Sequence, residues 1–180
     1  VDFIDTIIKL VSQKYNLNQD RIYSTGMSNG GFMSYHLACN LSSKIAAVAS
    51  VTGSMSKETY EDCNPDHPTS ILQVHGTIDA TVPFEGNSAL GMRSINDVMN
   101  YWKLYDACDT EPVSIITDYF DIEISVQHDT YLNCLNDVQV ELYKIEGMGH
   151  RWPNKQRYGI SATETIWEFI NLYDINGKIN

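Results

Sequence analysis

One serine of this sequence stands in a setting that favours nucleophilic chemistry. The segment Gly26-Met27-Ser28-Asn29-Gly30-Gly31 follows a strand-like run, 21–25, and precedes a helix-like stretch. Glycines around Ser28 permit a sharp turn from strand to helix, where side chains would collide. Such a turn strains the serine backbone and holds its hydroxyl clear of the sheet. The backbone N–H of Asn29 is then the one oxyanion-hole donor that the sequence identifies.

A serine of this kind needs a base and an acid, and two later segments supply them. A histidine must take the hydroxyl proton, and a carboxylate must orient that histidine. Asp79 follows the strand-like run 71–75, and His150 follows the strand-like run 138–145. Each residue thus comes just past the end of a strand, in the order serine, acid, histidine. The sequence predicts a catalytic triad of Ser28, Asp79 and His150.

Other ionisable residues compete for these roles. Glu85, six residues beyond Asp79, is the rival acid. His75 precedes the acid, which favours a structural hydrogen-bonding role for it. No grouping of His, Asp and Glu has the spacing of metal ligands, so we expect neither a metal nor a cofactor. The remaining candidates are expected at the surface or internally hydrogen-bonded: His36 on a helix, and His67, His128, Asp62, Asp66 and Asp109 in polar loops.

The pattern of apolar residues predicts the scaffold. Helical spacing predicts helices over 2–15, from 29 to about 39, over 95–105 and from 162 onward, the last two opened by capping boxes. Runs of β-branched residues predict buried strands at 22–25, 44–52, 71–75 and 138–145. Residues 53–70 are expected to form a loop, and 113–132 a hairpin or an irregular excursion. The alternation indicates one α/β domain with a mostly parallel sheet and helices on both faces.

Composition excludes several classes of function. The 180 residues are 43% hydrophobic, which is enough for one domain with a core. The formal net charge of −11 argues against nucleic-acid binding, which needs clustered Lys and Arg. No apolar run approaches the roughly 18–20 residues of a membrane span.

The four cysteines favour two disulfides. They stand at 39, 63, 108 and 134 without a Cys-x-x-Cys pair, so a zinc or thioredoxin-like site has little support. Three pairings are possible, and we favour Cys39–Cys63 with Cys108–Cys134, which close the two short sequential loops. Each would contribute about 3–4 kcal/mol. Disulfides imply an oxidising compartment. Four reduced, buried cysteines are the alternative.

Three longer motifs carry a resemblance to a known family. They are Gly-Met-Ser-Asn-Gly-Gly-Phe-Met-Ser-Tyr from Gly26, His75-Gly-Thr-x-Asp79-x-x-Val-Pro-Phe, and Gly147-x-Gly-His150-x-Trp152-Pro. They resemble the secreted polyhydroxybutyrate depolymerases and feruloyl or acetylxylan esterases, which are α/β-hydrolases. The resemblance implies an extracellular serine esterase that acts on an ester substrate. Trp152 would either line the substrate cleft or pack under its loop.

The resemblance also sets an expectation about the extent of the chain. The sequence begins at Val1 without a signal peptide, and only one helix precedes the nucleophile strand, where this family has several strands. We therefore expect residues 1–180 to be the C-terminal portion of a longer hydrolase. It would lack the loop with the second oxyanion donor and would expose an apolar strand edge at 22–25. A prolyl-oligopeptidase-like serine peptidase and a non-catalytic hydrolase-fold fragment are the alternative functions.

Overall fold

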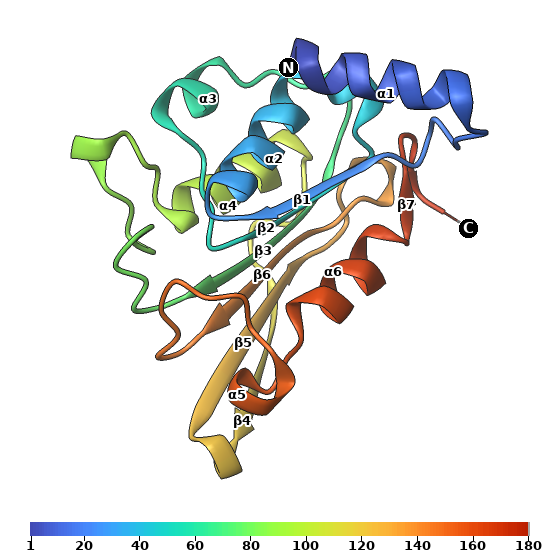
Figure 1. The fold of residues 1–180 in the computed structure, drawn as a ribbon. Helices are drawn as coiled ribbons and strands as arrows, with labels where there is room; N and C mark the ends of the chain where they lie inside the picture. The colour runs from blue at the N-terminus through green and yellow to red at the C-terminus, as the bar shows by residue number, and fades with distance from the viewer. Residues whose placement is uncertain (180) are drawn as a thin grey trace.

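A mixed six-stranded sheet forms the centre of the computed structural model, which describes residues 1–179 (Figure 1). The strand order is β1-β2-β3-β6-β5-β4. The first four strands in this order are parallel, and β5 and β4 continue the sheet in antiparallel pairing. Their bounds are β1 Tyr23–Met27, β2 Ala47–Val51, β3 Ser70–Gly76, β4 Val113–Tyr119, β5 Ile124–Tyr131 and β6 Val140–Ile145.

Helices cover both faces of the sheet, as the sequence predicts (Figure 1). One face carries α1 (Asp2–Lys14), α2 (Asn29–Asn40), α3 (Lys57–Asp62) and α4 (Ile95–Tyr105). The other carries α5 (Lys155–Tyr158) and α6 (Ala162–Ile170). The chain also forms short 3₁₀ turns at Ser42–Lys44, Ser88–Leu90, Phe120–Ile122 and Leu135–Asp137, and a small hairpin of β7 (Tyr173–Asp174) and β8 (Gly177–Lys178).

The central strands are buried on both faces because each face packs against helices. Along β3, Ile71 belongs to the core beneath α2 and α4, whereas Leu72 and Val74 belong to the core beneath α6. Alternation along a strand therefore directs Gln73 and His75 to the same face as Ile71. Two polar side chains thus point from the middle of the sheet toward α2 and α4.

Both favoured disulfides are present. Cys39–Cys63 joins the end of α2 to the residue after α3, and Cys108–Cys134 joins the segments that follow α4 and β5. The prediction of the pairing is confirmed, and the alternative of four reduced cysteines is wrong, since no cysteine is free in residues 1–179.

The structure corrects three local predictions, for residues 53–70, 22–25 and 44–52. Residues 53–70 are not all loop, because α3 begins after Ser56, whose Oγ accepts the backbone N–H of Thr59 at 3.1 Å. The nucleophile strand extends to Met27, and the strand predicted at 44–52 begins only at Ala47, after a 3₁₀ turn. Of the two alternatives for residues 113–132, the hairpin is confirmed. The short helix α5 was not predicted.

Strand β1 forms one edge of the sheet. Within residues 1–179 it pairs with β2 alone, which agrees with the predicted strand edge at 22–25. None of the helices in the described part of the chain is long and apolar enough to cross a membrane.

Candidate active site

The predicted triad residues follow three strands of the parallel part of the sheet. Ser28 comes directly after β1, Asp79 follows β3, and His150 follows β6. The carboxyl ends of parallel strands meet at one edge of a sheet, which is where α/β proteins bind ligands. Strand order places β3 between β2 and β6, so the acid and histidine loops leave adjacent strands.

Ser28 lies in the strained turn that the sequence predicts. Its backbone has φ 56° and ψ −120°, and it is the N-cap of α2. Its N–H donates to the carbonyl of Val51 at the end of β2 (2.9 Å), and its own carbonyl accepts the N–H of Phe32 (3.0 Å). A non-glycine residue persists in such a conformation only where its surroundings fix it. The neighbouring strand and the first turn of α2 provide that restraint.

Two glycines of the turn are required by close backbone approach. A Cβ on Gly26 would lie 2.6 Å from the carbonyl carbon of Gly30, and a Cβ on Gly31 would lie 2.4 Å from Ser50 Oγ. A Cβ on Gly30 would meet no atom within 4 Å. Gly26 and Gly31, rather than Gly30, are therefore the positions of this turn without space for a side chain.

The acid and the histidine make a direct hydrogen bond. His150 Nδ1 lies 2.8 Å from Asp79 Oδ2, and the other oxygen, Oδ1, accepts the backbone N–H groups of Thr81 (2.8 Å) and Val82 (2.9 Å). A carboxylate only accepts, so His150 Nδ1 carries the proton and the Nε2 of the neutral ring can act as a base. Asp79 is 4% exposed, whereas the His150 side chain is 21% exposed. The acid is shielded while its histidine reaches solvent.

A close contact between two loops holds this pair together. A Cβ on Gly76 would lie 2.0 Å from the carbonyl oxygen of Met148, so only glycine fits at the end of β3. Gly147 has φ +69°, and its N–H donates to Thr77 Oγ1 at 3.0 Å. The loops that carry the acid and the histidine are thus packed backbone to backbone.

The structure brings together two of the three triad side chains. Asp79 and His150 are bonded, and Ser28 lies at the same sheet edge, but among the described hydrogen bonds none joins Ser28 Oγ to His150. Catalytic hydrogen bonds are often long in unliganded proteins and tighten with substrate.

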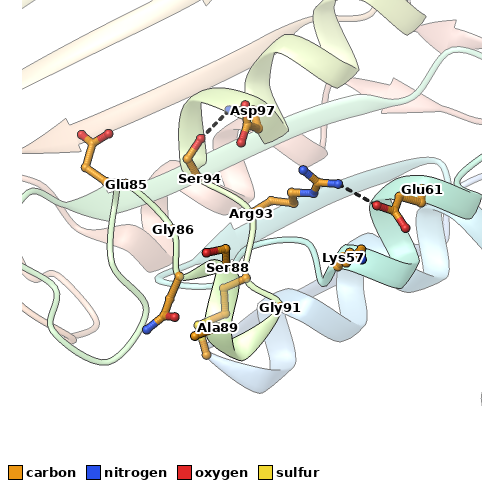
Figure 2. A pocket seen from close by; sticks show the side chains of 12 residues that line it. Lys57, Glu61, Glu85, Gly86, Ser88, Ala89, Gly91, Arg93, Ser94 and Asp97 are labelled. Carbon is orange, nitrogen blue, oxygen red and sulfur yellow. Dashed lines mark hydrogen bonds and ion pairs between the residues drawn. The ribbon is translucent and has the colours of Figure 1, made fainter.

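The rival acid does not contact the histidine. Glu85 is exposed and lies at the rim of a cavity of about 670 Å³ beside α3 and the start of α4 (Figure 2). None of the triad residues lines that cavity. Its lining residues are Lys57, Glu61, Glu85, Gly86, Asn87, Ser88, Ala89, Gly91, Met92, Arg93, Ser94 and Asp97.

His75 has the structural role predicted for it. It is fully buried, its Nε2 lies 2.9 Å from the carbonyl of Val82, and its Nδ1 lies 2.8 Å from Gln73 Nε2. Tyr35 on α2 bonds Gln73 in turn at 2.7 Å. Gln73 and Tyr35 were not predicted from the sequence. The available signal was the pair of polar residues at alternate positions of an otherwise apolar strand.

The other histidines are hydrogen-bonded at a distance from the triad. His36 Nδ1 lies 3.1 Å from Thr59 Oγ1, and both ring nitrogens of His67 lie against backbone carbonyls. The placement of His128 in a polar loop is wrong, because it lies on β5, where Glu141 binds it at 2.7 Å and Tyr143 stacks on its ring. As predicted, three acids are exposed: Asp62, Asp66 and Asp109. The placement of Asp62 in a loop is wrong, because it is the last residue of α3.

Two further predicted site residues flank the triad. Asn29 is the first residue of α2, so its N–H is one of the groups that have no acceptor within the helix. Trp152 is 37% exposed, and its indole N–H donates to Thr163 Oγ1 on α6 at 3.1 Å. In residues 1–179 no group of three or more His, Cys, Asp or Glu side chains has the geometry of a metal site.

Comparisons with known proteins agree with this architecture. A model of the phospholipase/carboxylesterase family matches residues 2–105. Feruloyl esterase B of Piromyces equi is 30% identical over 83% of the chain and 28% of its own length. The bifunctional acetylxylan esterase/xylanase XynS20E of Neocallimastix patriciarum is 24% identical over 99% of the chain and 24% of its own length. The chain thus spans about a quarter of these relatives.

A solved structure supports the fold independently. The crystal structure of the esterase PE8 superposes with a TM-score of 0.54 and covers 93% of this chain and 57% of that one, at 13% sequence identity. At this level of identity the likeness concerns the arrangement of the strands and helices.

Proposed function

The chain belongs to the phospholipase/carboxylesterase family, and on that premise we propose that it hydrolyses carboxylic esters through an acyl-enzyme on Ser28. The observation that carries the proposal is the bond between His150 and the buried Asp79, at the same sheet edge as the strained Ser28 turn. This combination supplies a nucleophile, a base and a group that orients the base.

In the first half of the proposed reaction an alcohol leaves. His150 Nε2 takes the proton of Ser28 Oγ while Oγ attacks the ester carbonyl carbon. The backbone N–H of Asn29 donates to the resulting oxyanion. The C–O bond to the alcohol then breaks, and the alcohol oxygen takes the proton from His150. Asp79 stays ionised throughout, holds the ring by Nδ1 and stabilises the imidazolium.

In the second half water replaces the alcohol. His150 removes a proton from water, whose oxygen attacks the acyl-enzyme carbonyl. The bond to Ser28 Oγ breaks, Oγ regains the proton, and the carboxylic acid is released. No cofactor or metal takes part in these steps.

Ester-linked decorations of plant polysaccharides are the proposed substrates. The support is the names of the relatives, a feruloyl esterase and an acetylxylan esterase/xylanase. Oligomers of polyhydroxyalkanoate are the second class, which rests on the motif resemblance alone. The two disulfides support an extracellular site of action, since such bonds persist in oxidising compartments.

A panel of substrates tests the proposal and separates it from the peptidase alternative. Initial rates would be compared on p-nitrophenyl butyrate, methyl ferulate, acetylated xylan, hydroxybutyrate oligomers and a prolyl anilide. We expect hydrolysis of one or more esters, none of the anilide, and loss of activity in Ser28→Ala. Faster cleavage of the anilide than of any ester would favour the peptidase alternative over the proposed esterase. Ester hydrolysis that persists in Ser28→Ala would place the chemistry elsewhere.

A further inference from the structure

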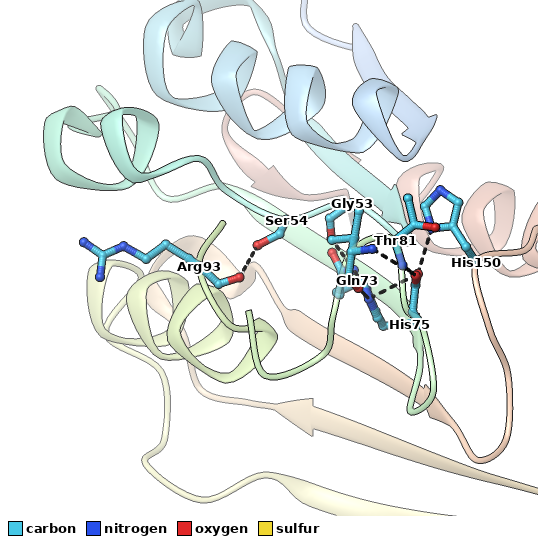
Figure 3. A network of polar contacts seen from close by, with 9 residues as sticks. Gly53, Ser54, Gln73, His75, Thr81, Arg93 and His150 are labelled. Atoms are coloured by element: carbon cyan, nitrogen blue, oxygen red, sulfur yellow. Dashed lines mark hydrogen bonds and ion pairs between the residues drawn. The ribbon is translucent and has the colours of Figure 1, made fainter. Parts of the chain in front are cut away.

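A series of buried polar side chains leads from α2 through β3 to the acid loop. Figure 3 shows the part of this series that runs from Gln73 and His75 to the acid loop. Tyr35 O–H donates to Gln73 Oε1 at 2.7 Å. Gln73 Nε2 donates to the carbonyl of Gly53 at 3.0 Å and lies 2.8 Å from His75 Nδ1. Tyr35, Gln73 and His75 are each 0% exposed. Burial of polar groups is costly unless every one has a partner, so this series is a specific arrangement.

The partners fix where the protons lie. The carbonyl of Val82 can only accept, so His75 Nε2 carries the ring proton and donates it at 2.9 Å. His75 Nδ1 is then an acceptor for the amide of Gln73, whose carbonyl oxygen is occupied by Tyr35. The hydrogen bonds of the series are therefore all donated in one direction, from the Tyr35 hydroxyl toward the acid loop.

Burial keeps the ends of the series uncharged. Desolvation lowers the pKa of His75, against the opposing effects of Val82 and Asp79, so the ring stays neutral near pH 7. Desolvation also raises the pKa of Tyr35, so its hydroxyl remains a donor. The ionisable groups around His75 are Asp79 and His150. Lys144, on the neighbouring strand β6, lies opposite His75 in the strand register.

The series ends on the residue that holds the acid. The N–H of Val82 donates to Asp79 Oδ1 and its carbonyl accepts His75, so this peptide segment is bound at both sides. His75 Nε2 itself lies 3.7 Å from Asp79 Oδ2, too far for a hydrogen bond. His75 therefore acts on the carboxylate through the loop backbone. Its neutral ring also leaves His150 as the partner of Oδ2.

We propose that His75 is a positioning residue: oriented by Gln73 and Tyr35, it fixes the Val82 backbone so that Asp79 Oδ2 stays directed at His150. This inference rests on the proposed triad. Misplacement of a catalytic group by about 1 Å can cost about 100-fold in rate. Loss of the donor to Val82 should consequently reduce turnover more than substrate binding.

The test compares His75→Phe with His75→Gln. Phenylalanine keeps a ring but donates nothing, so we expect kcat to fall about 10- to 100-fold with KM nearly unchanged. The amide of glutamine can donate to Val82, and His75→Gln should recover most of kcat. The NMR signal of the His150 Nδ1 proton should exchange faster with water in His75→Phe and remain protected in His75→Gln.

A matched control separates positioning from general stability. Both ring nitrogens of His67 also lie against hydrogen-bond partners, but His67 precedes β3 and Asp79 follows it, so the two lie at opposite ends of this strand. His67→Phe should lower the melting temperature without changing kcat or the His150 signal. Should His75→Phe not fold, Tyr35→Phe removes only the first hydroxyl of the series and should still reduce kcat, with KM unchanged.

Each outcome decides the proposal. Unchanged kcat and an unchanged Nδ1 signal in His75→Phe, or in Tyr35→Phe if the first does not fold, would overturn the positioning role. Equal losses in His75→Phe and His75→Gln would do the same. If the wild-type chain hydrolyses no ester, the proposed function fails, and the Nδ1 signal still shows whether His75 holds the Asp79–His150 bond.

Discussion

Ser28 occupies a backbone conformation that costs a non-glycine residue on the order of 1–3 kcal/mol. The strain of its φ of 56° would be relieved if the turn could relax, but the hydrogen bond from Ser28 N–H to Val51 holds the turn at the end of β2. The adjacent glycines permit this close packing: Gly26 lies against Gly30, and Gly31 against Ser50. The strand-to-helix turn at Ser28 therefore depends on the absence of a Cβ atom at Gly26 and at Gly31.

A pair of alanine substitutions tests this reading of the turn. Gly26→Ala places a Cβ 2.6 Å from backbone, so we expect a lower melting temperature and reduced ester hydrolysis. Gly30→Ala has free space within a helix and should stabilise the fold by about 0.4–1 kcal/mol. Thermal unfolding of both variants measures the difference. Equal melting temperatures for the two variants would contradict the assigned contacts.

The pairing of the acid with the histidine could be predicted from the sequence, whereas the packing of the glycine turn could not. Asp79 could be preferred to Glu85 because it follows a strand end more closely, and its bond to His150 agrees with that choice. Gly31 could not be distinguished from Gly30, because its constraint comes from Ser50, which is distant in sequence. Tyr35, the partner of Gln73, was missed for the same reason, since its helix must first be packed against β3.

Asp106 connects three elements at the end of α4. Its Oδ1 accepts the N–H of Thr69 just before β3 (3.1 Å), and its backbone carbonyl accepts the N–H of Leu135 (2.8 Å). The side chain is buried, and Oδ2 has no partner among the described atoms. Burial raises the pKa of Asp106 to about 8. The folded chain therefore favours the protonated carboxyl.

This buried acid predicts a pH dependence of stability. Because the pKa of Asp106 is raised in the folded state, the folded chain keeps a proton that the unfolded chain releases above about pH 4. The free energy of unfolding therefore falls as the pH rises from about 4 to about 8. Asp106→Asn keeps the oxygen that accepts Thr69 but cannot ionise. We expect the melting temperature of the wild type to fall more between pH 5 and pH 8.5 than that of the variant.

The size of this effect is measurable by calorimetry. A difference of one unit between the pKa values of the folded and unfolded states changes the free energy of unfolding by about 1.4 kcal/mol. In a chain of this size, 1 kcal/mol moves the melting temperature by about 2–4 °C. Parallel melting curves for wild type and Asp106→Asn would contradict the burial argument. Asp106→Ala, which lacks the acceptor, should be destabilised at both pH values.

Elements with strong local signals were predictable, and those without them were not. Ser94 and Ser161 cap α4 and α6 as the capping boxes indicate. The six residues of α3 are too few to show helical periodicity. Strand β4 is exposed at six of its seven positions, so no buried face fixes it as a strand, and the sequence left a hairpin and an irregular excursion open for residues 113–132. Its pairing with β5 defines it instead.

The proposed triad depends on the molecule as a whole, because its residues follow three different strands. The parallel order β1-β2-β3-β6 is what brings these strand ends to one edge. Alternating helices and strands predicted that parallel core. The addition of β5 and β4 beyond β6 was not predictable, since the position of a hairpin in a sheet depends on which strand remains unpaired. The proposed catalytic residues therefore all follow strands of the parallel part of the sheet.

Site-resolved labelling by a fluorophosphonate tests the central claim most directly. The reagent forms a stable bond with a serine that its histidine activates, and peptide mass spectrometry locates the adduct. We expect one adduct, on the peptide that contains Ser28, in the full chain, and none in Ser28→Ala. Absence of an adduct at Ser28, or equal labelling of Ser28→Ala, would contradict it.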